Sequence, residues 1–124
     1  MTKAPHEYTR SEYLARAIRP EDDEFWRLMK VAREAEQLRR NVERELLAAA
    51  GLHRPDETDR ALKARSVPKK VKAAYQMARH EENQASISVD RYCAHKSVIA
   101  RALAAGLNVP PDVLSEYPAL SAAA

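Results

Sequence analysis

Hydrophobic residues recur every three or four positions along most of the chain, which predicts helices that each have one apolar side. The longest such stripe lies between residues 20 and 50 and consists of Phe25, Leu28, Met29, Ala32, Ala35, Leu38, Val42, Leu46 and Ala49. Acidic residues at positions 21–24 favour the start of this helix, because carboxylates stabilise the positive end of the helix dipole. Gly51 predicts its end, since glycine readily takes the left-handed conformation that follows a helix. The stripe predicts that Leu38, at its middle, is buried.

A shorter helix is predicted before this one, over residues 9–19. Thr9 and Glu12 have the spacing of a capping box, in which each side chain bonds to the backbone N–H of the other residue. Pro20 disfavours helical geometry at Arg19, so this helix should end there.

A second long stripe follows Pro68 and continues to about residue 105. Polar residues at 81–88 interrupt it and predict a break or kink near residues 84–88, with one continuous helix over 68–105 as the alternative. Between the two long stripes, the basic connecting segment 53–67 predicts either a short helix through Ala64 or an exposed linker.

The C-terminal part predicts a clip over residues 107–120. Gly106 should end the second long stripe, and the adjacent prolines at 110 and 111 predict an extended corner and the start of a short helix. The apolar side chains that follow, Val113, Leu114 and Tyr117, should cover one end of the bundle.

These elements together predict an all-α fold. We expect a helical bundle of four to six helices, built on a long antiparallel helical hairpin (residues 20–50 and 68–105) with a short C-terminal packing helix. The length of 124 residues fits a single helical domain, 1–124, and a content of only 2 glycines disfavours a turn-rich β fold.

The C-terminal pattern also resembles a helical tail module of phage, plasmid and integrative-element proteins. That module usually reads G-x-x-V-P-x-E-V-L-x-D-Y-P-x-L. The matching positions here are Gly106, Val109, Pro110, Val113, Leu114, Tyr117, Pro118 and Leu120, preceded by His95, Val98, Ala102 and Leu103. Asp112 stands where the module has glutamate. The resemblance implies a mobile genetic element and assigns no catalytic residue.

Positive charge is concentrated in the middle of the chain. Residues 53–80 hold eight basic and three acidic groups, a net charge of +5, whereas the whole chain carries +3. Long basic side chains around a corner at 66–68 could reach a phosphate backbone, and such binding falls steeply with salt. We therefore predict a site for nucleic acid or an acidic partner, the basic corner, consisting of Arg60, Lys63, Arg65, Lys69, Lys70 and Lys72. An ordinary solvated surface is the alternative.

Other chemistry has little support in the sequence. His6, His53, His80 and His95 lack the spacing of a metal site, and there is neither a phosphate-binding glycine-rich loop nor a nucleophile elbow. We expect no enzyme, no cofactor, no metal and no small-molecule substrate. No apolar run reaches the roughly 20 residues that span a bilayer, and the N-terminus lacks a signal-peptide core, so we expect a cytoplasmic protein without a membrane partner.

The sequence thus predicts a non-enzymatic binding protein of a mobile genetic element such as a phage or plasmid. Its basic corner would contact nucleic acid or a host nucleoprotein complex, and an inhibitor of a host defence complex is one concrete form. The alternative is an oligomeric structural or assembly adaptor, of packaging or scaffold type, that self-associates through the long helix.

Overall fold

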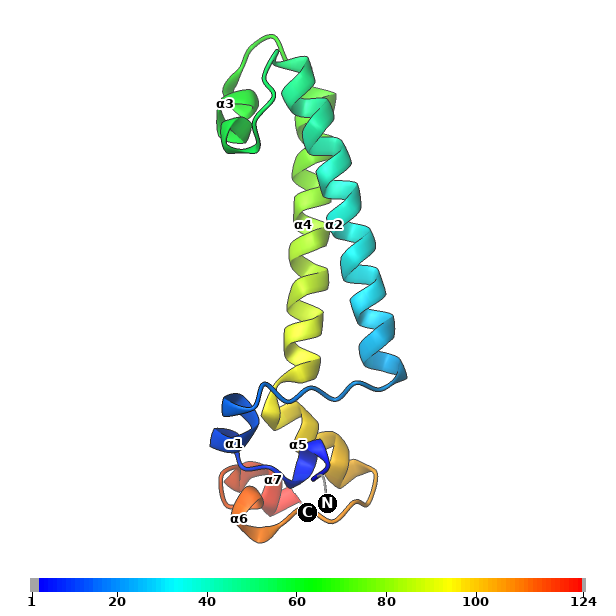
Figure 1. Ribbon diagram of the computed structural model, residues 1–124, viewed down its shortest axis with the longest axis vertical. Coiled ribbons are helices and arrows are strands. Elements are labelled where there is room, and N and C mark those ends of the chain that lie inside the picture. The colour runs from blue at the N-terminus through cyan, green and yellow to red at the C-terminus, as the bar shows by residue number, and fades with distance from the viewer. Residues whose placement is uncertain (1–2, 124) are drawn as a thin grey trace. The chain divides into compact units, whose positions relative to one another are not determined.

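The computed structural model describes residues 3–123, which form helices and short connections without a β-strand among them (Figure 1). The elements are η1 (Pro5–Glu7), α1 (Arg10–Ala15), α2 (Asp23–Ala49), η2 (Pro55–Glu57), α3 (Thr58–Lys63), α4 (Lys69–Cys93), α5 (His95–Ala104), α6 (Pro111–Leu114) and α7 (Pro118–Ala123). Helices α2 and α4 lie side by side as an antiparallel pair. The predicted all-α fold on a long helical hairpin is confirmed, with seven α-helices in the described residues rather than four to six.

The described residues divide into two compact units. Unit 1 joins the chain up to Trp26 with the chain from Val89 onward, and unit 2 is the continuous segment Arg27–Ser88. Among these residues, unit 1 contains two buried clusters and unit 2 contains one. A single domain over residues 1–124 stays a prediction, and residues 1, 2 and 124 lie outside the described part of the chain.

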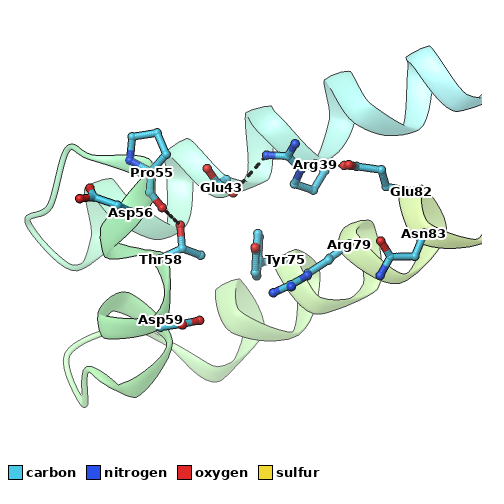
Figure 2. Close-up of a pocket in the computed structure, with 10 residues that line it drawn as sticks. All are labelled: Arg39, Glu43, Pro55, Asp56, Thr58, Asp59, Tyr75, Arg79, Glu82 and Asn83. Carbon is cyan, nitrogen blue, oxygen red and sulfur yellow. Dashed lines mark hydrogen bonds and ion pairs between the residues drawn. The ribbon is translucent and has the colours of Figure 1, made fainter. Parts of the chain in front are cut away.

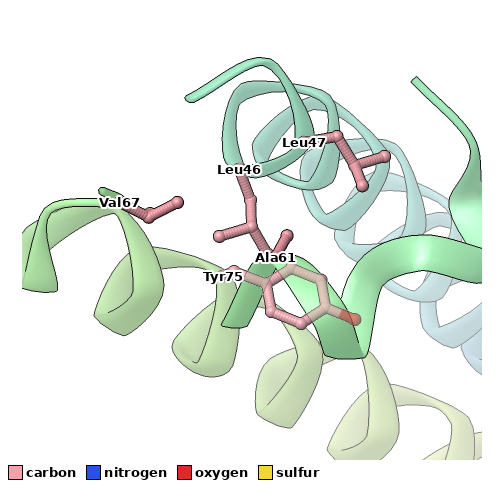
Figure 3. Packing of buried hydrophobic residues seen from close by; sticks show 5 residues of the cluster. All are labelled: Leu46, Leu47, Ala61, Val67 and Tyr75. Carbon is pink, nitrogen blue, oxygen red and sulfur yellow. The ribbon is translucent and has the colours of Figure 1, made fainter. Parts of the chain in front are cut away.

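The core of unit 2 gathers side chains from four segments (Figure 3). Its buried members come from α2, from α3, from the connection that follows α3 and from α4: Leu46, Leu47, Ala61, Val67 and Tyr75. Leu46 and Ala61 have no exposed surface. This cluster fixes the short helix α3 against the two long helices, so the segment 53–67 contains a helix and is not an extended linker.

Two helix starts are held by side-chain caps. The predicted capping box is present, because the N–H of Glu12 donates to Oγ1 of Thr9 (3.3 Å) and the N–H of Thr9 donates to Oε1 of Glu12 (3.1 Å). Oδ1 of Asp22 accepts the N–H of Phe25 (2.8 Å), so α2 begins at position 23 and only the last two of the four acidic residues lie in its first turn.

Two helices end at the predicted glycines, and one ends early. Gly51 (φ 71°) follows α2 and Gly106 (φ 74°) follows α5. In both cases the N–H of the next residue donates to a carbonyl in the last helical turn, at 2.8 and 2.9 Å. The prediction that the first helix ends at Arg19 is wrong. It ends at Ala15, because Ala17 takes the same left-handed conformation (φ 49°) without being a glycine.

The break in the second long stripe lies at Ala94. Both predicted versions, a break near 84–88 and a continuous helix over 68–105, are therefore wrong. Helix α4 continues to Cys93, because its polar stretch is largely solvent-exposed and its side chains need no apolar partner there. Ala94 takes an extended conformation (ψ 136°), and His95 after it is buried.

The hydrophobic stripe of α2 is less buried than predicted. Of the α2 residues 27–45, all of which the structure describes, none is buried. Leu38 is 46% exposed, so the prediction that it lies in a packed seam is wrong. The periodic pattern identifies a helical side, but the facing stretch of α4 presents mainly alanines and polar residues, which cover only part of that side.

The C-terminal clip packs on α5 within unit 1. Ile99 and Ala102 of α5 form a buried cluster with Val109 and Val113, and Leu103, Leu114, Tyr117 and Leu120 pack around it. Pro111 occupies the first position of α6, as predicted, but Pro118 begins a further helix, α7, that the sequence did not indicate. Most positions of the C-terminal pattern are therefore packing positions of unit 1.

His95 connects three segments of unit 1. Its Nε2 lies 2.8 Å from the carbonyl oxygen of Tyr8, and its Nδ1 lies 2.7 Å from the hydroxyl of Tyr117. The ring of Tyr13 lies 4.9 Å from the ring of His95, and the Tyr13 hydroxyl donates to the carbonyl of Cys93. His95, whose position in the sequence did not indicate a metal site, is thus a buried residue that links the N-terminal segment, α5 and the clip.

Candidate nucleic-acid interface

The six residues of the basic corner lie on consecutive elements of unit 2. Arg60 and Lys63 belong to α3, Arg65 belongs to the connection that follows, and the three lysines belong to the first turns of α4. The cluster in Figure 3 holds these elements together, because it takes Ala61, Val67 and Tyr75 from them. The structure therefore places all six basic residues on elements that surround one core.

Most charges of the basic corner are unpaired. Arg60 lies 3.5 Å from the carboxylate of Glu57, and its side chain is 77% exposed, so this ion pair is weak. Within the described part of the chain, the other five have no ion-pair partner. Their side chains are exposed except that of Lys72, which is half-buried. A positive surface that is not neutralised by its own neighbours attracts anions.

Helix α4 begins with an unusual charge pattern. Its first turn contains Lys69 and Lys70 and no acidic residue, whereas the first turn of α2 contains Asp23 and Glu24. Because the N-terminus of a helix carries partial positive charge, each such lysine is unfavourable by about 0.3–1 kcal/mol. The unpaired backbone N–H groups and the ammonium groups would both be stabilised by a bound phosphate or carboxylate.

A polar depression of ≈ 490 Å³ lies in unit 2 (Figure 2). It is lined by Arg39, Glu43, Pro55, Asp56, Thr58, Asp59, Tyr75, Arg79, Glu82 and Asn83. Several of these groups satisfy one another: Arg39 donates to Glu82 (Nε to Oε2, 2.6 Å) and to Glu43 (3.2 Å), and Thr58 donates to the carbonyl of Pro55 (2.7 Å). The hydrogen bond to Glu82 raises the pKa of Arg39.

Arg79 and Asn83 differ from the other polar residues of the depression. Figure 2 shows both side chains projecting from α4 into the same open space as Tyr75. Neither side chain has a hydrogen-bond or ion-pair partner among the described residues. They were not among the predicted site residues. The signal that identifies them is spacing, since they follow Lys72 at helical intervals of seven and eleven residues on one side of α4.

The side chains of the basic corner supply hydrogen-bond donors and positive charge, which suit phosphate and carboxylate oxygens. The lining of the depression is different, because it contains four carboxylates (Glu43, Asp56, Asp59 and Glu82) and two arginines. Among the described residues, no group of three or more His, Cys, Asp or Glu side chains is placed to hold a metal ion. The helices that the structure describes include none long and apolar enough to cross a membrane.

Comparison with protein-family models, with curated proteins and with solved structures found no match to this chain. Its function is therefore inferred from its own residues.

Proposed function

We propose that this protein binds nucleic acid through the basic corner. One observation carries the proposal: six basic residues lie on elements around a single core, and five of them have no ion-pair partner in the described part of the chain. Two of these, Lys69 and Lys70, lie in the first turn of a helix, where their charge is unfavourable unless an anion binds. The residue types are those that contact phosphate groups without reading sequence.

The cellular context is part of the same proposal and has separate support. The C-terminal resemblance to tail modules of phage, plasmid and integrative-element proteins favours a mobile genetic element acting in the cytoplasm. There the protein would act on nucleic acid or on a host nucleoprotein complex, for example as an inhibitor of host defence.

The test reverses the charge of the basic corner. In the variant with Lys69→Glu, Lys70→Glu and Lys72→Glu, nucleic-acid binding should be lost, while the new carboxylates suit a helix start and preserve the fold. A control with Lys30→Glu, Arg33→Glu and Arg44→Glu on α2 changes the net charge equally at exposed positions of the same unit. Mobility-shift titrations of both variants and the unaltered protein, with circular dichroism spectra, make the comparison.

The salt dependence of the binding constant gives the number of phosphate contacts. If all six basic residues touch duplex phosphates, the logarithm of the binding constant should fall with the logarithm of salt concentration with a slope of about −5. Equal loss of binding in both triple variants would contradict a localised site. If the unaltered protein shows no shift at low salt and the first variant alone loses an acidic protein partner, the basic corner is a protein-docking surface instead.

A second candidate function, the self-associating adaptor, is favoured by a different observation. Val31 and Leu38 are 45% and 46% exposed, and with Ala35 and Ala85 they line a groove of ≈ 380 Å³ in unit 2. If copies associate through this groove, Leu38→Asp should lower the molecular mass in solution without unfolding the monomer. Light scattering after size-exclusion chromatography measures this, with Arg44→Asp as the exposed control. A monomeric unaltered protein at working concentrations excludes the adaptor.

A further inference from the structure

We infer that α4 is a recognition helix whose polar side reads base edges in the major groove of double-stranded DNA, with Gln76, Arg79 and Asn83 as the reading side chains. The inference rests on the proposed function. It adds the kind of nucleic acid and the residues that select its sequence.

One side of α4 carries only basic and hydrogen-bonding residues over its first four turns. Their spacing of three or four positions places them in one row: Lys69, Lys72, Gln76, Arg79, His80 and Asn83. At 1.5 Å per residue this row is about 21 Å long. All of its side chains are exposed except that of Lys72, which is half-buried.

The acidic residues of the same stretch lie off this row. Glu82 faces α2, where it accepts a hydrogen bond from Arg39 at 2.6 Å. Glu81 lines the groove beside Leu38. The row itself therefore contains no carboxylate, and Glu82, which lines the same depression as Arg79 and Asn83, is already paired with Arg39.

The hydrogen-bonding groups of the row are unused within the chain. In the described part of the structure, the side chains of Gln76, Arg79, His80 and Asn83 have no hydrogen bond or ion pair. On α2 some polar side chains pair with one another, as Gln37 does with Asn41 (3.0 Å) and Arg40 with a glutamate one turn away (2.6 Å), whereas Lys30, Arg33 and Arg44 have no such partner among the described residues. The groups of the α4 row are likewise free to bind a partner.

The chemistry of the row matches base edges. Glutamine and asparagine pair with adenine through two hydrogen bonds, and arginine pairs in the same way with guanine. Arg79 and Asn83 border the ≈ 490 Å³ depression beside Tyr75, which Thr58 and Asp59 of α3 border as well, and both side chains are exposed (Figure 2). The lysines at the start of the row would hold the phosphate backbone while the side chains further along reach the bases.

This geometry favours duplex DNA over RNA. The major groove of B-form DNA admits one α-helix, whereas the major groove of A-form RNA is too narrow for one. In α4 the lysines of the first turn would lie against the phosphates, and the side chains proposed to read the bases follow them in the second to fourth turns.

The test is selection of binding sites from a random pool of duplex DNA, followed by measured affinities for the selected duplex and a scrambled duplex. The unaltered protein should enrich a motif. Gln76→Ala and Asn83→Ala should each reduce the preference for that motif about 5- to 150-fold, while the affinity for the scrambled duplex changes less than about 2-fold. Gln37→Ala and Asn41→Ala, the same residue types on α2, are matched controls and should keep the preference.

Three results would overturn the inference in distinguishable ways. If binding depends on the basic corner but no motif is enriched, α4 is not a recognition helix, although the proposed function still holds. The same conclusion follows if both α4 variants keep the preference for the motif. A preference for single-stranded DNA or for RNA over the duplex has the same consequence. If the protein binds no nucleic acid at all, both the recognition helix and the proposed function are wrong.

Discussion

His95 shows how one buried polar residue can organise unit 1. A carbonyl oxygen only accepts hydrogen bonds, so Nε2 must donate to Tyr8, and in a neutral imidazole Nδ1 then accepts from the hydroxyl of Tyr117. Both ring nitrogens are thereby satisfied in a site that is only 5% exposed. Removal of one partner leaves a buried polar atom without a hydrogen bond, which costs more than the net gain from an ordinary hydrogen bond.

Tyr117→Phe tests this link. The variant keeps the ring and its contact with His95 but removes the hydroxyl, so Nδ1 is left unpaired and stability should fall by about 1–3 kcal/mol. Tyr75→Phe is the matched control, because the Tyr75 hydroxyl has no hydrogen-bond partner among the described residues. Urea denaturation of both variants gives the comparison. Equal stability of Tyr117→Phe and the unaltered protein would show that water replaces the hydroxyl.

At the scale of elements, Asp22 joins the start of α2 to the end of α4 within unit 1. Its Oδ1 caps α2, and its Oδ2 accepts the hydroxyl of Tyr92 at 2.6 Å. Burial alone would raise the pKa of Asp22, but the hydrogen bonds from Tyr92 and from the N–H of Phe25 outweigh it and lower this pKa below its usual 3.8. Burial and the same contact raise the pKa of Tyr92 to about 12.

Asp22→Asn should therefore have a stability deficit that depends on pH. Asparagine can cap a helix almost as well, so the variant removes mainly the charge. Because the pKa of Asp22 is lower in the folded state, its stabilising effect is present above the usual pKa and is lost as pH falls through the folded-state pKa. Thermal midpoints measured from pH 7 to pH 2 should show the two proteins converging. A constant difference would mean that the charge contributes nothing.

Removal of the clip tests a second element. Deletion of residues 110–124 takes Val113 and Tyr117 from unit 1 and exposes Ile99 and Ala102 of α5. Burial of one such large side chain stabilises by roughly 1.5–3 kcal/mol, so the truncated chain should melt at a clearly lower temperature. Calorimetry of the two chains provides the measurement, and an unchanged midpoint would make the clip a surface for a partner.

Element boundaries were predictable from the sequence where local chemistry decides them. Gly51, Gly106 and the capping box at Thr9 and Glu12 require only their immediate neighbours, and the structure confirms all three. The break at Ala94 was not predictable in this way. It accompanies the burial of the following histidine against a carbonyl 87 positions away in sequence, a contact that no local pattern contains.

At the scale of the whole molecule, the distribution of charge along the sequence could identify the basic residues of the candidate site but not its uncharged residues. The grouping of the six residues of the basic corner could be predicted because the short elements that carry them keep residues that are close in sequence close in space, and their role as a binding site stays a prediction. Gln76 and Asn83 are uncharged and gave no signal in a count of charge. Their proposed role rests on their exposure and on having no partner within the described residues, which a sequence alone does not show.

The division into two units leads to a prediction about cooperativity. The core of unit 2 draws all its members from residues 42–75, and the cluster under the clip draws all its members from residues 99–120. A cavity in one cluster should therefore promote local opening mainly in its own unit. Leu46→Ala, which should cost about 2–5 kcal/mol, is expected to speed amide hydrogen exchange within residues 27–88. Val113→Ala is expected to speed amide hydrogen exchange within α5 and α6.

Exchange rates measured by mass spectrometry on both variants distinguish two arrangements. Because α2 and α4 contribute residues to both units, their amides near Trp26 and Val89 report whether opening passes from one unit to the other. Increases confined to the altered unit would mean that the basic corner and the clip open independently. Equal increases throughout the described residues would instead mean that the chain unfolds as the single cooperative domain expected from its length.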